Sequence, residues 1–186
     1  MRFAEFEPIR TERLSLRKMV REDAVLYYQR LASSEAVSRY MLFSPQTDPA
    51  EAVASVQKAI SRYESKLAYR WVLDLPGEGL IGVVDLLRFD EKESSCSFAY
   101  MLAEDFWGRG YGTEALRAVF AFGFENMELD WIEADHMAEN PASGAVMRKA
   151  GMVYRRTEKD RYEKNGKLHD AHVYRITRAQ WQGISM

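Results

Sequence analysis

Three β-rich runs in the middle of the chain follow one another with connections too short to contain a helix. The runs at residues 71–75 and 80–87 are separated only by the turn-forming cluster Pro76-Gly77-Glu78-Gly79, and a third run at 94–102 follows a charged loop. Strands joined in this way lie antiparallel, because a parallel crossover needs about a dozen residues or more. The central part of the chain therefore predicts an antiparallel sheet.

Helical and strand patterns surround these runs. Alternation of apolar and polar residues predicts strands, and apolar residues at helical spacing predict helices. The further strands are expected at 11–17, 131–136, 152–162 and 170–177, the last two joined through Asn165-Gly166. The helices are expected at 21–32, from Asp48-Pro49 to about Lys66, at 113–125, and at 143–150 with Gly151 as its C-terminal cap. We expect one α+β domain over residues 1–186, with a core at about 11–181 and a mixed, mostly antiparallel sheet of about seven strands flanked by about four helices.

Composition narrows the classes of function. Lys and Arg number 26 against 28 Asp and Glu, a net charge of −2, so there is no basic excess for a polyphosphate backbone and we expect no nucleic-acid partner. The single cysteine, Cys96, cannot form an internal disulfide or a cysteine-based metal cluster. The chain has no run approaching the roughly 20 apolar residues of a membrane helix and no secretion signal. We expect a cytoplasmic protein without a membrane partner.

A glycine-rich turn precedes the helix expected at 113–125. Glycines at 108, 110 and 112 leave backbone N–H groups uncovered where the helix begins, and Arg109 adds positive charge. Such a site attracts phosphate, although a turn that only needs positive φ is the alternative. A nucleotide P-loop would need Lys-Ser/Thr after the last glycine, and Thr-Glu follows here. The dinucleotide pattern belongs to parallel βαβ units, whereas this turn follows antiparallel strands.

Asn140 and Ser143 lie at the start of the helix expected at 143–150. An asparagine at a strand end can bond a ligand amide through its donor and its acceptor, and a hydroxyl three residues later projects toward the same cleft. The alternatives are a helix cap for Asn140 and exposed helix surface for Ser143.

Three segments, taken together, carry a resemblance to a known family. They are Thr11-Glu12-Arg13-Leu14-Ser15-Leu16-Arg17, then Phe106-Trp107-Gly108-Arg109-Gly110-Tyr111-Gly112-Thr113-Glu114-Ala115, then Asn140-Pro141-Ala142-Ser143 with Val146-Met147-Arg148-Lys149-Ala150-Gly151-Met152. In this order and spacing the chain resembles the GCN5-related N-acetyltransferases, specifically the ribosomal-protein-alanine (RimJ/RimL-type) branch, over roughly residues 11–181. That branch commonly carries tryptophan at the position of Trp107, where the wider family has Gln or Arg.

The resemblance implies acetyl-CoA as co-substrate, lying in a splayed sheet formed by the strands around 80–87 and 94–102 and the strand at 131–136. Backbone amides of the glycine turn would hold the pyrophosphate, and backbone at the end of the preceding strand would pair with the pantetheine arm. Asn140 and Ser143 would face the pantetheine end and the sulfur. The expected cofactor-binding residues are Met101, Leu102, Ala103, Trp107, Gly108, Arg109, Gly110, Tyr111, Gly112, Thr113, Asn140 and Ser143.

The chain departs from the family at the positions of the acid and the base. Many relatives place a tyrosine, which protonates the departing thiolate, where this chain has Met147, and Ser143 is then the leading replacement. Relatives often carry a glutamate base at the position of Ser97. The base therefore stays open, and the candidates, acting directly or through water, are Asp85, His136 and Glu163. A backbone N–H around Leu102 would stabilise the oxyanion, as the family suggests.

The resemblance predicts an N-acetyltransferase that moves an acetyl group directly to a primary amine. The acceptor is either a protein N-terminus, whose pKa near 8 demands little help from a base, or a small molecule such as a polyamine, an amino acid or an aminoglycoside-like compound. A catalytically silent coenzyme A-binding or sensory module is the alternative, and another donor such as succinyl-CoA is a third possibility. Relatives often pair, so a homodimer is a further expectation.

We expect neither the cysteine nor the two histidines near the C-terminus to carry chemistry. Strict alternation places Cys96 on the strand face opposite Ser97, so we expect it in the core rather than in a covalent acetyl-cysteine route. His169 and His172 point to opposite faces of a strand. We therefore expect no metal.

Overall fold

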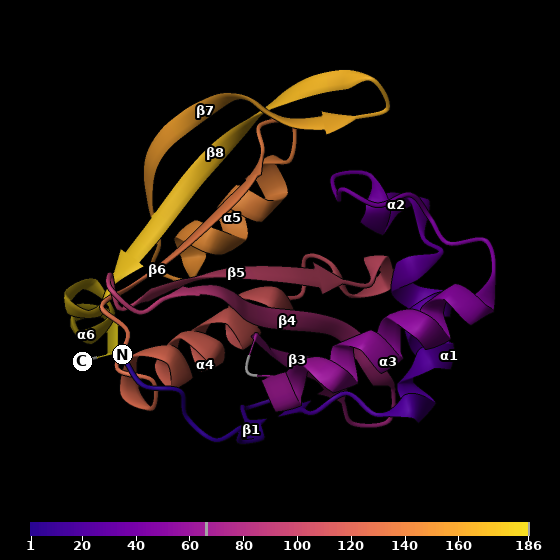
Figure 1. Ribbon diagram of the computed structural model, residues 1–186, viewed down its shortest axis with the longest axis horizontal. Helices are drawn as coiled ribbons and strands as arrows, with labels where there is room; N and C mark the ends of the chain where they lie inside the picture. Colours follow the sequence, from indigo (N-terminus) through magenta and orange to yellow (C-terminus); the bar gives the residue numbers. More distant parts are fainter. Residues whose placement is uncertain (66, 186) are drawn as a thin grey trace.

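One eight-stranded sheet organises the computed structural model, which describes residues 1–65 and 67–185 (Figure 1). Its strand order is β1-β2-β3-β4-β5-β6-β8-β7, and every neighbouring pair is antiparallel except β5 and β6. The strands are β1 (Ile9–Arg10), β2 (Ser15–Arg17), β3 (Ala68–Leu75), β4 (Gly79–Asp90), β5 (Ser95–Leu102), β6 (Trp131–Met137), β7 (Val153–Lys164) and β8 (Lys167–Thr177). The predicted α+β class with a mixed, mostly antiparallel sheet is confirmed.

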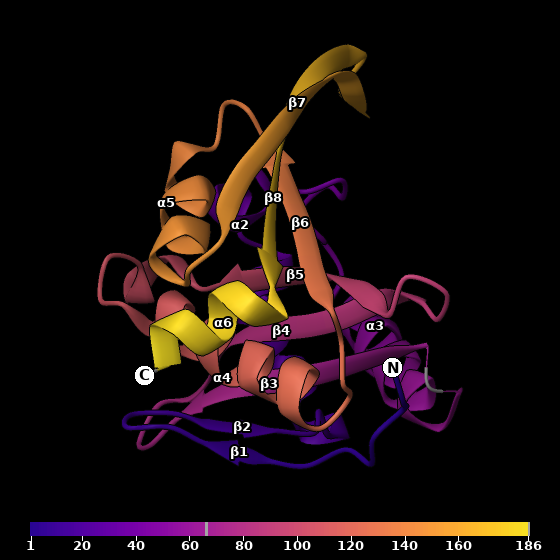
Figure 2. The same ribbon diagram turned by 90° about the vertical axis from the view of Figure 1, so that its left-hand side faces the viewer.

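Helical segments connect and cover these strands. They are η1 (Arg21–Asp23), α1 (Ala24–Tyr27) and η2 (Tyr28–Ala32), which form one continuous helical stretch, then α2 (Glu35–Ser38), α3 (Pro49–Ser65), η3 (Glu104–Phe106), α4 (Tyr111–Glu125), α5 (Pro141–Lys149) and α6 (Arg178–Ser185). Figure 2 shows β1 and β2 at one edge of the sheet and the β7–β8 hairpin at the other.

The sheet has two faces, which we name the α4 face and the α3 face after the helices that cover them. On the α4 face, Trp71 of β3 contacts Phe122, and Phe98 of β5 contacts Phe120. On the α3 face, the hydroxyl of Tyr63 in α3 donates to the carbonyl of β3 residue Arg70. Successive side chains of a strand alternate between these faces, so a residue's place in the strand decides which helices it meets.

Local sequence signals set several of the boundaries. α3 begins after Asp48, whose carboxylate accepts the amide of Ala50 at 2.9 Å. Asn140 caps α5 with a proline as its first residue, and Gly151, at φ 99°, follows its C-terminal end. The β7–β8 turn uses Asn165-Gly166, both at positive φ (52° and 71°), as a tight hairpin requires.

The strand predicted at 11–17 is partly wrong. Only Ser15–Arg17 form β2, and the preceding residues turn back from β1. The Thr11 hydroxyl accepts the amide of Leu14 at 3.0 Å, so this side chain replaces strand pairing with a local turn. The short elements β1, α2 and α6 were not predicted, and Lys66, the predicted end of the second helix, lies outside the described residues.

Candidate functional site

The sheet opens between β5 and β6. These strands pair in parallel only at Ser95↔Trp131, Cys96↔Ile132 and Ser97↔Glu133, yet β5 continues to Leu102 and β6 to Met137 (Figure 1). Beyond Ser97, β5 therefore keeps β4 on one side and has no strand partner on the other within the described chain. The second half of β5 is a free strand edge inside the molecule.

Register determines which backbone groups line this opening. The Ala103 amide donates to the Ile81 carbonyl at 2.8 Å, and Met101 pairs with Val83, so both residues turn their backbone groups toward β4. The backbone groups of Tyr100 and Leu102 therefore point toward the opening. The Leu102 carbonyl already accepts the indole N–H of Trp107 at 2.7 Å. Of the three residues predicted to pair with a ligand, Leu102 alone offers its amide to the opening.

The glycine turn connects this edge to α4. Gly108 (φ 73°) and Gly110 (φ 86°) both adopt left-handed conformations that favour glycine. Gly110 is the N-cap of α4 and has no side chain to cap it. The first-turn amides of Tyr111, Gly112 and Thr113 are therefore left for a ligand or solvent, and the positive end of the helix dipole adds to them. Both the conformation and the open cap fit an anion site.

Thr11 and Arg13, near the N-terminus, hold this turn through hydrogen bonds. Glu114 in the first turn of α4 accepts the Thr11 hydroxyl at 2.6 Å and Arg13 Nε at 2.7 Å. Arg13 also donates to the Arg109 carbonyl at 2.9 Å. Burial alone would raise the pKa of Glu114, but the hydrogen bonds from Thr11 and Arg13 outweigh it and lower that pKa below its usual value. Residues predicted as a strand thus hold the glycine turn in place.

The start of α5 approaches the same opening from the α4 face. The Asn140 carboxamide oxygen accepts the Ser143 amide at 3.3 Å, so Asn140 is a cap. The hydroxyl of the half-buried Tyr100, on β5, donates to Ser143 Oγ at 3.2 Å. A Cβ at Gly112 would lie 3.8 Å from the Tyr100 ring. The free strand edge, the glycine turn and α5 therefore converge on one place.

Tyr100 is the functional candidate that the sequence patterns missed. Burial raises its pKa, and its bond to Ser143 offsets this only in part, so the hydroxyl stays protonated. Its side chain alternates with Met101 and faces α4, and this strand position was the available signal. Its partner lies 43 residues away, which no local pattern reveals.

The comparison with protein families decides the class. A family model described as an acetyltransferase (GNAT) domain matches residues 13–153. The chain belongs to the GNAT acetyltransferase family. It is an N-acetyltransferase, as the motifs predicted, and the glycine turn and α5 lie within the matched residues.

Relatives of this acetyltransferase match it over most of their length. An uncharacterized N-acetyltransferase of Bacillus licheniformis is 27% identical over 95% of this chain and 99% of that protein. The structure of RimL, a ribosomal-protein α-N-acetyltransferase in complex with coenzyme A, superposes with a TM-score of 0.83 at 22% identity, covering 92% of this chain and 98% of that one. The spermidine N-acetyltransferase of Vibrio cholerae, in complex with CoA and spermine, gives 0.80 at 20% identity, covering 92% and 99%. These structures share the fold of this acetyltransferase.

The three predicted base candidates do not come together. Asp85, on the α3 face, is held by Arg70 through two hydrogen bonds of 2.6 and 2.7 Å. His136 lies on the α4 face, where a Cβ at Gly144 of α5 would be 2.6 Å from its Nε2. Glu163 is exposed on β7, next to Tyr162 and on the opposite strand face. Each carboxylate or imidazole thus has a different environment.

His136 is a neutral, packed side chain in this acetyltransferase. Burial lowers its pKa, although a hydrogen bond between Nδ1 and the Met137 carbonyl at 2.8 Å acts in the opposite direction. Its Nε2 is buried without a hydrogen-bond partner among the described residues. Because the ring lies on the same side of the sheet as Ser143, it does not face the α3 side of the opening.

We expect Asp85→Asn to destabilise the protein rather than to remove a base. The substitution leaves the Arg70 guanidinium, whose side chain is only 18% exposed, without its counter-charge. Breaking such a pair costs about 3 kcal/mol, which chemical denaturation measures as a lower free energy of unfolding. Replacing both partners, as Arg70→Met with Asp85→Leu, should recover most of this loss. If Asp85→Asn kept its free energy of unfolding but lost turnover, Asp85 would instead act as a catalytic residue.

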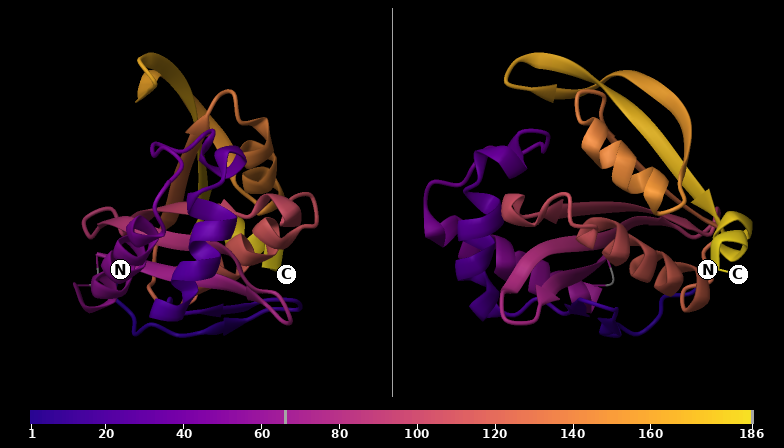
Figure 3. Two further views of the ribbon diagram at one scale, coloured as in Figure 1. Left: turned by 90° about the vertical axis from the view of Figure 1, so that its right-hand side faces the viewer. Right: turned by 180° about the vertical axis from the view of Figure 1, so that it is seen from behind.

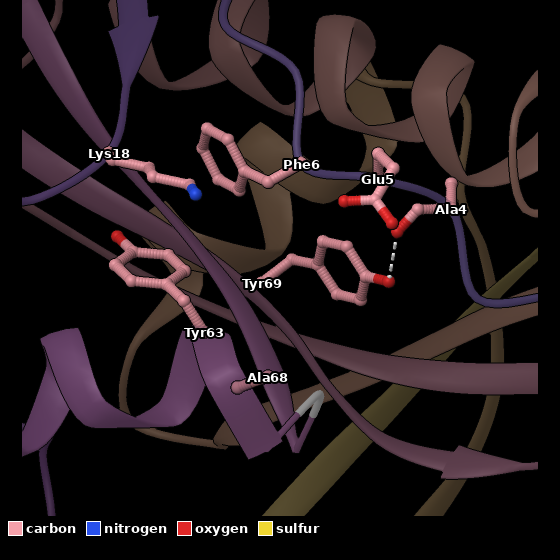
Figure 4. A pocket seen from close by; sticks show the side chains of 7 residues that line it. All are labelled: Ala4, Glu5, Phe6, Lys18, Tyr63, Ala68 and Tyr69. Atoms are coloured by element: carbon pink, nitrogen blue, oxygen red, sulfur yellow. Dashed lines mark hydrogen bonds between the residues drawn. The ribbon is translucent and has the colours of Figure 1, made fainter.

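A hollow near the N-terminus shares none of its lining residues with this site; it is lined by Ala4, Glu5, Phe6, Lys18, Tyr63, Ala68 and Tyr69 (Figure 4). Lys18 lies beside it, with Nζ 5.2 Å from the centre of the Phe6 ring and 5.4 Å from that of Tyr63. The Tyr69 hydroxyl donates to the Ala4 carbonyl at 2.7 Å. The Lys18 ammonium thus already lies over the Phe6 and Tyr63 rings, and we assign this hollow to packing of the N-terminal segment.

Three further observations concern metal ligands, the cysteine and membrane helices. The described residues contain no group of three or more His, Cys, Asp and Glu side chains placed to hold a metal ion. Cys96 is buried in the core, and burial raises the pKa of its thiol. No helix in the described part of the chain has the length and apolar character to cross a membrane.

Proposed function

We propose that this acetyltransferase binds acetyl-CoA in the opening between β5 and β6 and transfers the acetyl group directly to a primary amine. The observation that carries this proposal is the continuous path from the free edge of β5 to the uncapped N-terminus of α4. An extended arm with amides fits a strand edge with unpaired backbone groups. A pyrophosphate fits the amides at the glycine turn.

Each residue of the path receives a role under this proposal. The amides of Tyr111, Gly112 and Thr113 hold the pyrophosphate, and Gly108 and Gly110 let the backbone approach it, with Arg109 adding charge. Asn140 orders the start of α5 and faces the pantetheine end. Bound acetyl-CoA supplies an activated thioester and a thiol leaving group.

The chain's own groups then handle charge and protons. The Leu102 amide, which points into the opening, donates to the acetyl carbonyl oxygen and stabilises negative charge there. The Ser143 hydroxyl donates a proton to the departing sulfur. Tyr100, bonded to Ser143 at 3.2 Å, holds its proton at neutral pH and passes it to the Ser143 oxygen, and solvent then reprotonates Tyr100. Met147, a buried residue of α5, takes no part in this transfer.

The acceptor is a protein N-terminus or a small-molecule amine. Both kinds occur among the proteins of similar fold, one named for a ribosomal protein and one for spermidine. No feature of the glycine turn or of α5 distinguishes them, because these elements contact the donor rather than the acceptor.

Two measurements test the proposed function. Calorimetric titration with acetyl-CoA should show saturable one-to-one binding, and a thiol-release screen over amines and N-terminal peptides should identify an acceptor class. Binding without release from any acceptor would favour a silent coenzyme A-binding module. Absence of binding would overturn the assignment of the opening.

A further inference from the structure

Asp135 lies on the α3 face just beyond the point where the sheet opens. Glu133 is the last β6 residue paired with β5, opposite Ser97, and Asp135 is the next β6 residue on the same face. Its counterpart along β5 is Ala99, whose side chain is small. A carboxylate therefore stands at the mouth of the opening, on the side of the sheet away from Ser143.

Two other carboxylates on this face are already paired with arginine side chains. Asp85 is held by Arg70 in a two-point ion pair. Glu133 forms ion pairs with Arg175 and Arg156, with N···O distances of 2.8 and 3.3 Å. By contrast, the nearest guanidinium nitrogen to Asp135 is that of Arg161 at 4.0 Å, and Arg161 pairs with Glu158 at 2.9 Å. Asp135 thus retains an acceptor oxygen for a cationic ligand.

Tyr162 holds the Asp135 side chain in this position. Its hydroxyl donates to Asp135 Oδ1, which leaves Oδ2 as the freer oxygen. Burial and the neighbouring Asp135 raise the pKa of Tyr162 to about 12, so the hydroxyl remains a donor at neutral pH. The carboxylate is therefore oriented by a hydroxyl that keeps its proton at neutral pH.

The hairpin that carries Tyr162 is tied across the α3 face. At its tip, Lys164 Nζ donates to the carbonyls of Ser38 and Met41 at 2.6 and 2.5 Å. This joins the end of β7 to the segment at and after α2, 123 or more residues away in the chain (Figure 3). Because the Lys164 ammonium is used by these carbonyls, it does not neutralise Asp135.

We propose that Asp135, oriented by Tyr162, receives the acceptor amine and takes its proton. This inference rests on the proposed function and specifies its acceptor as a primary amine that is cationic in solution. The ammonium binds to Asp135 and passes its first proton to the carboxylate. The neutral nitrogen forms the C–N bond as the C–S bond breaks, its next proton goes to solvent, and the sulfur takes a proton from Ser143. Solvent then takes the proton from Asp135 and, through Tyr100, returns one to Ser143.

The test compares two nucleophiles with the full-length wild-type protein and Asp135→Asn. One is the fastest acceptor among spermidine, methylamine and an N-terminal alanine peptide, all ammonium ions at pH 7, and the other is hydroxylamine, which is neutral at that pH. We expect kcat/KM to fall about 100-fold for the ammonium acceptor and less than about 3-fold for hydroxylamine, because a neutral nucleophile needs no ion pair. The Kd for acetyl-CoA should stay unchanged.

Two further variants separate this role from a structural one. Tyr162→Phe keeps the ring but removes the hydroxyl, and we expect a loss of about 10-fold for the ammonium acceptor alone. Asp170→Asn is the matched control, because it removes a carboxylate of the same hairpin that pairs with Lys159 on the surface, and its kinetics should equal the wild type.

The outcomes distinguish this inference from the proposed function. Equal losses for both nucleophiles, or normal kinetics in Asp135→Asn, would overturn the role of Asp135 while leaving the acetyltransferase assignment intact. A wild-type protein that binds no acetyl-CoA and releases no thiol with either nucleophile would overturn both.

Discussion

Gly110→Val should weaken acetyl-CoA binding about 100-fold while the protein stays folded. Gly110 has φ 86°, a conformation that a β-branched residue adopts only with strain, and it stands directly before the first-turn amides of α4. A Cβ there would also lie 3.2 Å from Arg13 Nη2, so the side chain would disturb the arginine that holds the turn and move these amides away from the pyrophosphate. Losing two hydrogen bonds to a charged group at about 1.5 kcal/mol each accounts for roughly 100-fold in affinity. Calorimetric titration of the folded variant measures the change.

Gly77→Val is the matched control for this prediction. Gly77 has φ 83°, close to that of Gly110, but it lies in the β3–β4 turn, and a Cβ there would meet no heavy atom within 4 Å. This variant carries the same backbone strain and should lose stability while binding acetyl-CoA normally. A folded Gly110→Val protein with wild-type affinity would remove the glycine turn from the binding site.

Ser143→Ala should reduce kcat about 100-fold with little change in acetyl-CoA affinity. If Ser143 supplies the proton to sulfur, its removal costs the usual contribution of a general acid. The helix should persist, because Asn140 caps α5 through the backbone amide of residue 143 and not through the serine hydroxyl. Steady-state kinetics and calorimetry on the same preparation separate the two effects.

Tyr100→Phe is a second variant that tests the same proton path. Because Tyr100 acts through Ser143 under the proposed function, we expect about a 10-fold loss in kcat, and the double variant should be no slower than Ser143→Ala alone. Ser61→Ala, on the exposed side of α3, is the control and should behave like the wild type. Wild-type turnover in Ser143→Ala would exclude the serine from the mechanism.

Much of the fold follows from local patterns. The short connections around Pro76–Gly79 require antiparallel neighbours, and the caps at Asp48 and Asn140 with Gly151 mark helix ends within a residue or two. These signals work because a turn or a cap involves atoms close together in the chain. The turn at Thr11 could not be predicted, because the alternation of apolar and polar residues there is also typical of a strand.

The family and the conformation of the glycine turn were also accessible from sequence. The glycine spacing reports a backbone conformation, and that conformation belongs to the turn itself, so Gly108 and Gly110 could be interpreted without knowing their neighbours. The same holds for a serine placed three residues after a helix cap.

Sequence by itself thus determined the α+β class, the positions of most elements, the glycine turn and the acetyltransferase motifs. Tertiary structure alone decided which carboxylate lies at the opening. Asp85 is paired with Arg70, whereas Asp135 accepts a hydrogen bond from Tyr162, which lies on another strand. It also joined Tyr100 to Ser143 and Arg13 to Glu114. The reason is strand register, because a shift of one residue turns every side chain to the other face, and register is set by contacts between distant segments.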